Sequence, residues 1–168
     1  MTYKSVCTGR ERGVYSFCMC PGGYVVNASS EKNMLAVNGM SYSGRDSSNA
    51  NSAMIVTVTP EDYGYGTLDG VKFQRKLETA AYIAGEGKIP VQLLGDFKEN
   101  TASTSLGAVS PCIKGEYKLT NVRSILPDYI AEAISEGVTG CDRYIKGFDM
   151  DEALFAGVES RTSSPVRI

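Results

Sequence analysis

The stretch VYSFCMCPGG, residues 14–23, decides how the fold begins. Over its first seven positions, bulky apolar side chains alternate with smaller ones, and this period of two is typical of a β-strand. The proline and two glycines that end the stretch predict a tight turn. Further short strands are predicted at residues 24–28, 34–37 and 53–59. The first third of the chain is therefore expected to form a β meander.

Two longer helices are predicted downstream. In the first, apolar residues recur three or four positions apart and so form one stripe: Phe73, Leu77, Ala80, Ala81 and Ala84. Charged residues such as Glu78 are expected mostly outside that stripe. The second helix opens at Pro127 and ends near Gly140, and a single helical turn follows the predicted N-cap Thr59.

Shorter elements complete the predicted fold. A short helix is expected at 119–125, strands at 90–97 and 153–159, and long polar loops at 41–52 and 99–110. Strands thus come first, helices next and strands again. This order predicts an α+β fold, with an antiparallel or mixed β-sheet and about three helices packed on one side.

Composition excludes several kinds of active site and partner. The 168 residues contain no histidine, so a Ser-His-Asp or Cys-His centre cannot form, and the usual zinc ligands are reduced to cysteine and carboxylate. Neither G-x-G-x-x-G nor G-x-x-x-x-G-K-[ST] occurs. The net charge of −2 lacks the basic excess of nucleic-acid binders, and no apolar run reaches the length of a membrane span. Five cysteines, an odd number, do not resemble a secreted disulfide framework, so a cytoplasmic protein is expected. Because the usual histidine ligands are lacking, no metal site is expected either.

Two short segments could nevertheless carry chemistry. If residues 17–20 are extended, Cys18 and Cys20 share one face of the strand, opposite Phe17 and Met19. The two thiols could pack as small apolar groups, form a redox pair or supply half of a metal site, and simple packing is favoured. The adjacent glycines at 22–23 could make only a turn, or they could let a ligand approach the backbone closely.

Arginines beside small polar residues form a second group of candidates. Arg161 lies in a stretch rich in serine and threonine that includes Ser163, a setting that suits anion recognition. The alternative is a surface arginine paired with Glu159. Arg45 presents the same choice in its long loop, and the neighbouring Tyr42 could be either a stacking surface or a loop anchor.

Four segments together resemble one family. They are YSFCMCPGG at 15–23, NGMSYSGRD at 38–46, IPVQLLGDF at 89–97 and GVESRTSSPVR at 157–167. They resemble the uncharacterised FAD-dependent dehydrogenases of bacteria, also described as NAD(FAD)-utilising dehydrogenases. The resemblance implies that FAD is bound mainly by a separate nucleotide-binding domain that this sequence lacks. Residues 1–12 would then be an inter-domain connection, and residues 13–168 an inserted substrate or cap domain, here as an excised fragment.

The resemblance also implies a site and partners. The candidates that would face flavin or substrate are Cys18, Cys20, Gly22, Gly23, Tyr42, Arg45, Arg161 and Ser163. The domain would cover the flavin and shape the pocket of a small-molecule substrate, while flavin performs the hydride chemistry with NADH or NADPH as the candidate reductant. Its partner would be the FAD-binding domain of its own parent chain. Alone it is expected to be inactive and to hold no tightly bound FAD.

A rival hypothesis comes from a different class of protein. The chain could be a free-standing binding module in which Cys18 and Cys20 act as a thiol redox sensor.

Overall fold

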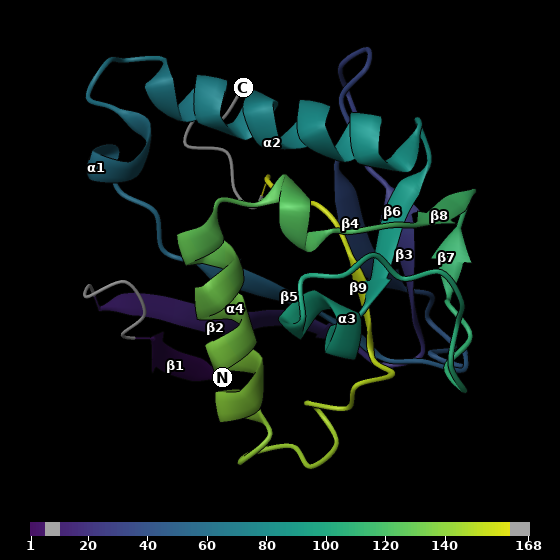
Figure 1. Cartoon of the computed structure of the whole chain (residues 1–168). Coiled ribbons are helices and arrows are strands. Elements are labelled where there is room, and N and C mark those ends of the chain that lie inside the picture. The colour runs from purple at the N-terminus through teal and green to yellow at the C-terminus, as the bar shows by residue number, and fades with distance from the viewer. Residues whose placement is uncertain (6–10, 162–168) are drawn as a thin grey trace.

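A computed structural model describes residues 1–5 and 11–161 of the chain (Figure 1). Its strands are β1 Thr2–Ser5, β2 Arg12–Cys20, β3 Gly23–Asn27, β4 Val37–Ser41, β5 Asn51–Val56, β6 Ile89–Leu93, β7 Ile113–Lys114, β8 Tyr117–Leu119 and β9 Leu154–Ala156. Its helices are α1 Pro60–Tyr63, α2 Asp69–Gly85, α3 Leu94–Lys98 and α4 Asp128–Cys141, with a 3₁₀ turn at Arg123–Ile125. The predicted α+β class is confirmed.

The described strands form three small sheets. The first has the order β1-β2-β5 and is antiparallel, the second has the order β4-β3-β7, and the third has the order β8-β6-β9. In the second sheet β3 is antiparallel to β4 and parallel to β7, and in the third β6 is parallel to β8 and antiparallel to β9. One of the three sheets is therefore antiparallel and two are mixed, so both predicted alternatives occur. Residues 1–5, expected in an inter-domain connection, here supply the edge strand β1.

Helix α4 covers one face of the first sheet. Pro127 is its N-cap and Asp128 lies in its first turn, as expected for a helix start. Ile130, Ile134 and Val138 recur at helical spacing and belong to a buried cluster that also receives Met54 and Val56 from β5. Helix α2 packs on the third sheet instead, around a second cluster that includes the following buried residues: Leu35, Val37, Ala81, Ile89, Val91, Val122, Ile125 and Val158.

The contact between α4 and β2 depends on a glycine. A methyl group at Gly137 would come within 3.0 Å of Cβ of Val14, and closer still to its Cγ1, while Val14 is fully buried. We therefore expect Gly137→Ala to lower the free energy of unfolding by about 1–3 kcal/mol, because overpacking outweighs the gain in helix propensity. Gly70→Ala in α2, where a methyl group would meet only Tyr63 at 3.6 Å, should be neutral or stabilising. Urea unfolding of the two variants would contradict this if Gly137→Ala were as stable as Gly70→Ala.

Three predicted elements are wrong in detail. The strand expected at 34–37 begins only at Val37, because Leu35 and Ala36 are buried by core packing in an irregular segment. The helix expected at 119–125 is instead the end of β8 followed by the 3₁₀ turn, in which Asn121 Oδ1 accepts a hydrogen bond from the Ser124 amide. The strand expected at 90–97 divides into β6 and α3, since continuous apolar runs do not distinguish a buried strand from a buried helix.

Candidate functional site

A β-bulge at Cys18 rearranges the predicted cysteine face. Phe17 pairs with Ala53 but Cys20 pairs with Asn51, so β2 has one extra residue, and Cys18 has a φ of 48°. Since the two β5 partners lie two residues apart, Phe17 and Cys20 share a face of the sheet. The expectation that Cys18 and Cys20 share a face opposite Phe17 is therefore wrong, because alternation in sequence does not reveal a bulge.

The bulge leaves both thiols free. Cys18 is exposed and Cys20 is half-buried, and neither is in a disulfide. Met19 lies beside Ser16, whose hydroxyl is 3.8 Å from its sulfur. Cys18 and Cys20 therefore do not share a face in the way that the thiol-sensor hypothesis assumes.

Another segment of the chain packs closely against the turn at Gly22 and Gly23. Gly22 has a φ of +52°, and a side chain there would meet the Asp46 amide nitrogen at 2.6 Å and the carbonyl of Arg45 more closely still. A side chain at Gly23 would meet Asn51 Nδ2 at 2.5 Å. The close backbone approach that two adjacent glycines permit is thus made by residues 45–51. The Arg45 side chain, on the outside of this loop, is exposed.

Tyr42 lies beside a second tyrosine and a lysine on the outer surface of the second sheet. The ring centroids of Tyr24 and Tyr42 are 5.6 Å apart, in an edge-to-face arrangement. The ammonium group of Lys114 lies 4.2 Å from the centroid of the Tyr24 ring and 5.5 Å from that of Tyr42. A shallow pocket between them is completed by Val26, Met40 and Ser41. Tyr42 thus contacts side chains of β3 and β7, and its two predicted roles, a stacking surface or a loop anchor, both stay predictions.

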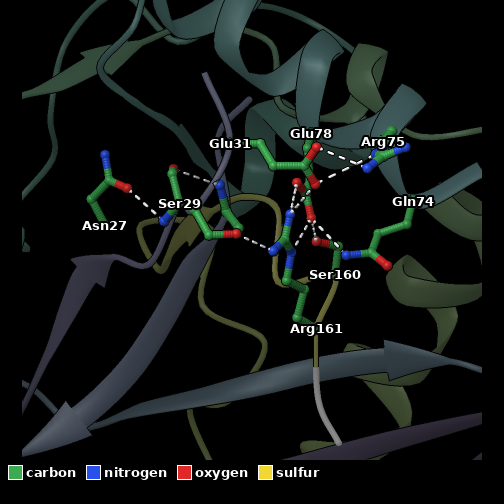
Figure 2. A network of polar contacts seen from close by, with 10 residues as sticks. Asn27, Ser29, Glu31, Gln74, Arg75, Glu78, Ser160 and Arg161 are labelled. Carbon is green, nitrogen blue, oxygen red and sulfur yellow. Dashed lines mark hydrogen bonds and ion pairs between the residues drawn. The ribbon is translucent and has the colours of Figure 1, made fainter. Parts of the chain in front are cut away.

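Arg161 is bound to a buried glutamate of α2 (Figure 2). It donates from Nε to Glu78 Oε1 at 2.7 Å and from Nη2 to Glu78 Oε2 at 2.6 Å, a bidentate arrangement. Ser160 Oγ and Gln74 Nε2 also donate to Glu78 Oε1, at 2.5 and 3.0 Å. The Arg161 guanidinium further meets Glu31 at 3.2 Å.

The electrostatics of Glu78 follow from these contacts. Burial by itself raises the pKa of this carboxyl, but hydrogen bonds from Arg161, Ser160 and Gln74, together with the charge of Arg161, lower it to about 2. The hydrogen bond to Glu78, with the charges of Glu78 and Glu31, raises the pKa of Arg161. The pair is therefore fully charged at neutral pH. Glu159, the partner that the sequence suggested, is not the one used; burial raises the pKa of its carboxyl.

Sequence reasoning missed Glu78, which was expected mostly outside the apolar stripe of its helix and is fully buried. Glu78 lies three residues before the buried Ala81, so the two are neighbours on the helix surface. This spacing was the signal in the sequence that Glu78 could be buried. Its partner Arg161 lies 83 positions away, so the pair could not be identified from spacing.

The predicted site residues form two separate groups. Gly23 pairs with Ser41 at one end of β4, where Gly22, Tyr42 and Arg45 also lie, whereas Val158 bonds to Val37 at the other end. A five-residue strand separates these ends by roughly 13 Å. Arg161 therefore belongs to a different part of the surface from the glycine turn and Tyr42. Ser163 lies outside the described residues.

The comparisons with known proteins decide the family. The chain matches the family described as FAD-dependent protein, C-terminal domain-like, over residues 1–162. The chain belongs to this family. An uncharacterized protein of Clostridium beijerinckii is 50% identical over 171 residues, which cover all of this chain and 32% of the relative. The FAD-dependent family that the four segments predicted is thus confirmed, and the chain spans about a third of the relative's length.

In this FAD-dependent C-terminal domain, the glycine pair at 22–23 packs against the chain itself. The adjacent glycines that could approach a pyrophosphate contact residues 45–51 instead. Across residues 1–5 and 11–161, no three histidine, cysteine, aspartate or glutamate side chains gather to hold a metal ion. Over the same ranges, each helix is too short or too polar to cross a bilayer.

Proposed function

We propose that this chain is the substrate or cap domain of an FAD-dependent oxidoreductase, a dehydrogenase. The family membership supports association with a flavoprotein. In the proposed arrangement another domain of the longer parent protein holds FAD, and this domain covers the flavin and shapes the substrate pocket. It has no activity alone, and the parent is cytoplasmic with NADH or NADPH as reductant.

The observation that carries the proposal is a sheet face that leaves two aromatic side chains partly exposed. In the first sheet, Val14 and its partner Val56 face α4, so Tyr15 and Phe17 face the opposite way. Their side chains are 39% and 44% exposed. An antiparallel sheet with one solvated face normally carries polar residues there, so exposed aromatic residues favour a surface that another domain covers.

The turn at Cys20–Gly23 lies at the end of this face. Cys20 shares the face with Phe17. A domain that covers Phe17 would therefore also reach the turn at Gly22 and Gly23 and the loop at 45–51 that packs against it. In the proposed parent, flavin supplies the hydride chemistry when bound. The residues of this chain exclude water from it and position the substrate.

The proposed function can be tested by measuring how well this domain shields the flavin from a quencher in solution. In the full-length parent, Phe17→Asp should loosen the cap and raise the quenching of flavin fluorescence by iodide. Ile83→Asp, which changes an equally apolar exposed residue on α2, should leave quenching unchanged. This chain alone, titrated with FAD, should show no tight binding. Stoichiometric FAD on the isolated chain, or equal quenching in both variants, would contradict the proposal.

A further inference from the structure

We propose that Lys114, Tyr24 and Tyr42 form a binding site for a small planar carboxylate, the anion-recognising part of the substrate pocket. The role in a substrate pocket rests on the proposed function, whereas the binding itself is a property of this chain. The site lies on the outer face of the second sheet and is distinct from the Glu78–Arg161 pair.

Three strands bring the site together. Tyr24 on β3 pairs directly with Met40 on β4, and Val26 on β3 pairs with Lys114 on β7. The alternate residues Val25 and Val37 pack against the core cluster, so the partners of this site face outward. Tyr42 follows immediately after β4. The positions of these side chains are thus set by strand register.

The charge of Lys114 is available to a ligand. Among the described residues no carboxylate lies within 4.0 Å of its ammonium group, which lies over two tyrosine rings. Lys88, directly before β6, and Lys118, on β8, are by contrast each paired with a glutamate, at 3.1 and 2.7 Å. Stacking over Tyr24 restrains the Lys114 side chain without neutralising it. An ammonium held in this way is ready to accept a carboxylate.

The walls of the site select a flat apolar body. Met40 is half exposed and Tyr42 is 61% exposed, and with Val26 they line a shallow concave surface beside the ammonium group. A ring attached to a carboxylate could lie against these side chains while its charge meets Lys114. An aromatic carboxylate therefore satisfies both parts of the site, and neither a simple anion nor a neutral ring does.

Arg161 is less suited to this role. Glu78 engages the Nε–Nη2 edge of its guanidinium, Nη1 donates to Ser30 Oγ, and Glu31 adds a second negative charge at Nη2. An incoming anion would have to compete with two carboxylates for Arg161, whereas among the described residues no carboxylate is paired with Lys114. The geometry thus assigns anion recognition to Lys114 rather than to the arginine that its sequence context suggested.

The test is a titration of this chain with benzoate, followed in amide NMR spectra. We expect saturable shifts at the amides of Tyr24, Met40, Tyr42 and Lys114. Benzyl alcohol, the same ring without charge, and acetate, the charge without the ring, should each bind about tenfold more weakly or worse, because each loses one part of the interaction.

Variants assign the interaction to its residues. Lys114→Met, an exposed change that leaves the core untouched, should weaken benzoate about tenfold and leave benzyl alcohol unchanged. Tyr42→Leu should weaken both ligands. The matched control Lys118→Met, which removes a lysine already paired with Glu86, should change neither.

Several outcomes would overturn the proposal. They are an absence of saturable shifts at the four amides, equal binding of benzyl alcohol and benzoate, and unchanged benzoate binding in Lys114→Met. None of these results bears on iodide quenching of the parent's flavin, so the carboxylate site and the cap function can fail separately.

Discussion

Replacing Glu78 by glutamine should lower the free energy of unfolding by about 3 kcal/mol at pH 7. The carboxylate is fully buried and is held by Arg161, Ser160 and Gln74. Removing one member of a buried ion pair costs about 3–5 kcal/mol. Arg161 keeps Glu31 and is 34% exposed, which places the expected loss at the lower end of that range. Urea unfolding at pH 7 measures it.

The pKa of Glu78 leads to a similar value for the contribution of this carboxylate to the free energy of unfolding. A tenfold change in an equilibrium constant corresponds to about 1.4 kcal/mol, so lowering this pKa from 4.5 to about 2 corresponds to about 3 kcal/mol. Because the folded-state pKa is below the unfolded one, this stability is fully present above pH 4.5 and is lost as the pH falls toward 2. The difference between the wild-type protein and Glu78→Gln should therefore shrink over that interval. A difference that stays constant with pH would contradict the assigned pKa.

Glu31→Gln is the matched control for this prediction. Glu31 belongs to the same network but is partly exposed and pairs with Arg75 and Arg161 near the surface. Its loss should cost less than about 1 kcal/mol, as for other exposed ion pairs. If the two glutamine variants were equally destabilised, burial would not be the cause of the effect at Glu78.

The sequence predicted elements well where local chemistry fixes them. Thr59 and Pro60 define the start of α1, and the apolar stripe from Phe73 to Ala84 defines most of α2, because capping and periodicity act over a few residues. The bulge at Cys18 depends on pairing with β5, and the position of β4 depends on core packing around Leu35. These features arise from contacts distant in sequence and leave no local signal.

For the site residues too, the sequence indicated local properties but not contacts between distant segments. The glycines at 22 and 23 were expected to form a turn or to let a ligand approach the backbone, and the sequence did not reveal that residues of the 45–51 segment pack against them. Tyr42 was recognised as a potential stacking surface, whereas its neighbour Lys114 was not, because β7 joins this sheet from 72 positions further along the chain. Residue type therefore indicated the chemistry, and only topology indicated which residues act together.

Replacing Arg12 by methionine should have an effect comparable to that of Glu78→Gln. Arg12 binds Asp62 through two hydrogen bonds of 2.8 and 2.6 Å, and the two side chains are 8% and 5% exposed. Its guanidinium also lies 4.3 Å from the centre of the Tyr129 ring. The hydrogen bonds from Arg12 hold the pKa of Asp62 below its ordinary value despite burial. Without Arg12 the aspartate is a buried charge lacking its countercharge, at an expected cost of about 3–5 kcal/mol.

The double variant Arg12→Met with Asp62→Asn distinguishes this cause from simple loss of packing. Asparagine removes the buried charge but can still accept the hydrogen bond that Asp62 takes from the Thr59 amide at 2.8 Å. The double variant should therefore unfold at a higher urea concentration than Arg12→Met alone, since removing both charges of a buried pair costs less than removing one. If the second substitution instead adds its own loss to the first, the contribution of Arg12 comes from its packing on Tyr129 and from the hydrogen bond that its Nη1 donates to the Thr57 carbonyl oxygen at 3.1 Å. In that case the ion pair does not stabilise the junction between β2 and α1, and the strand that presents Tyr15 and Phe17 is held by apolar contacts.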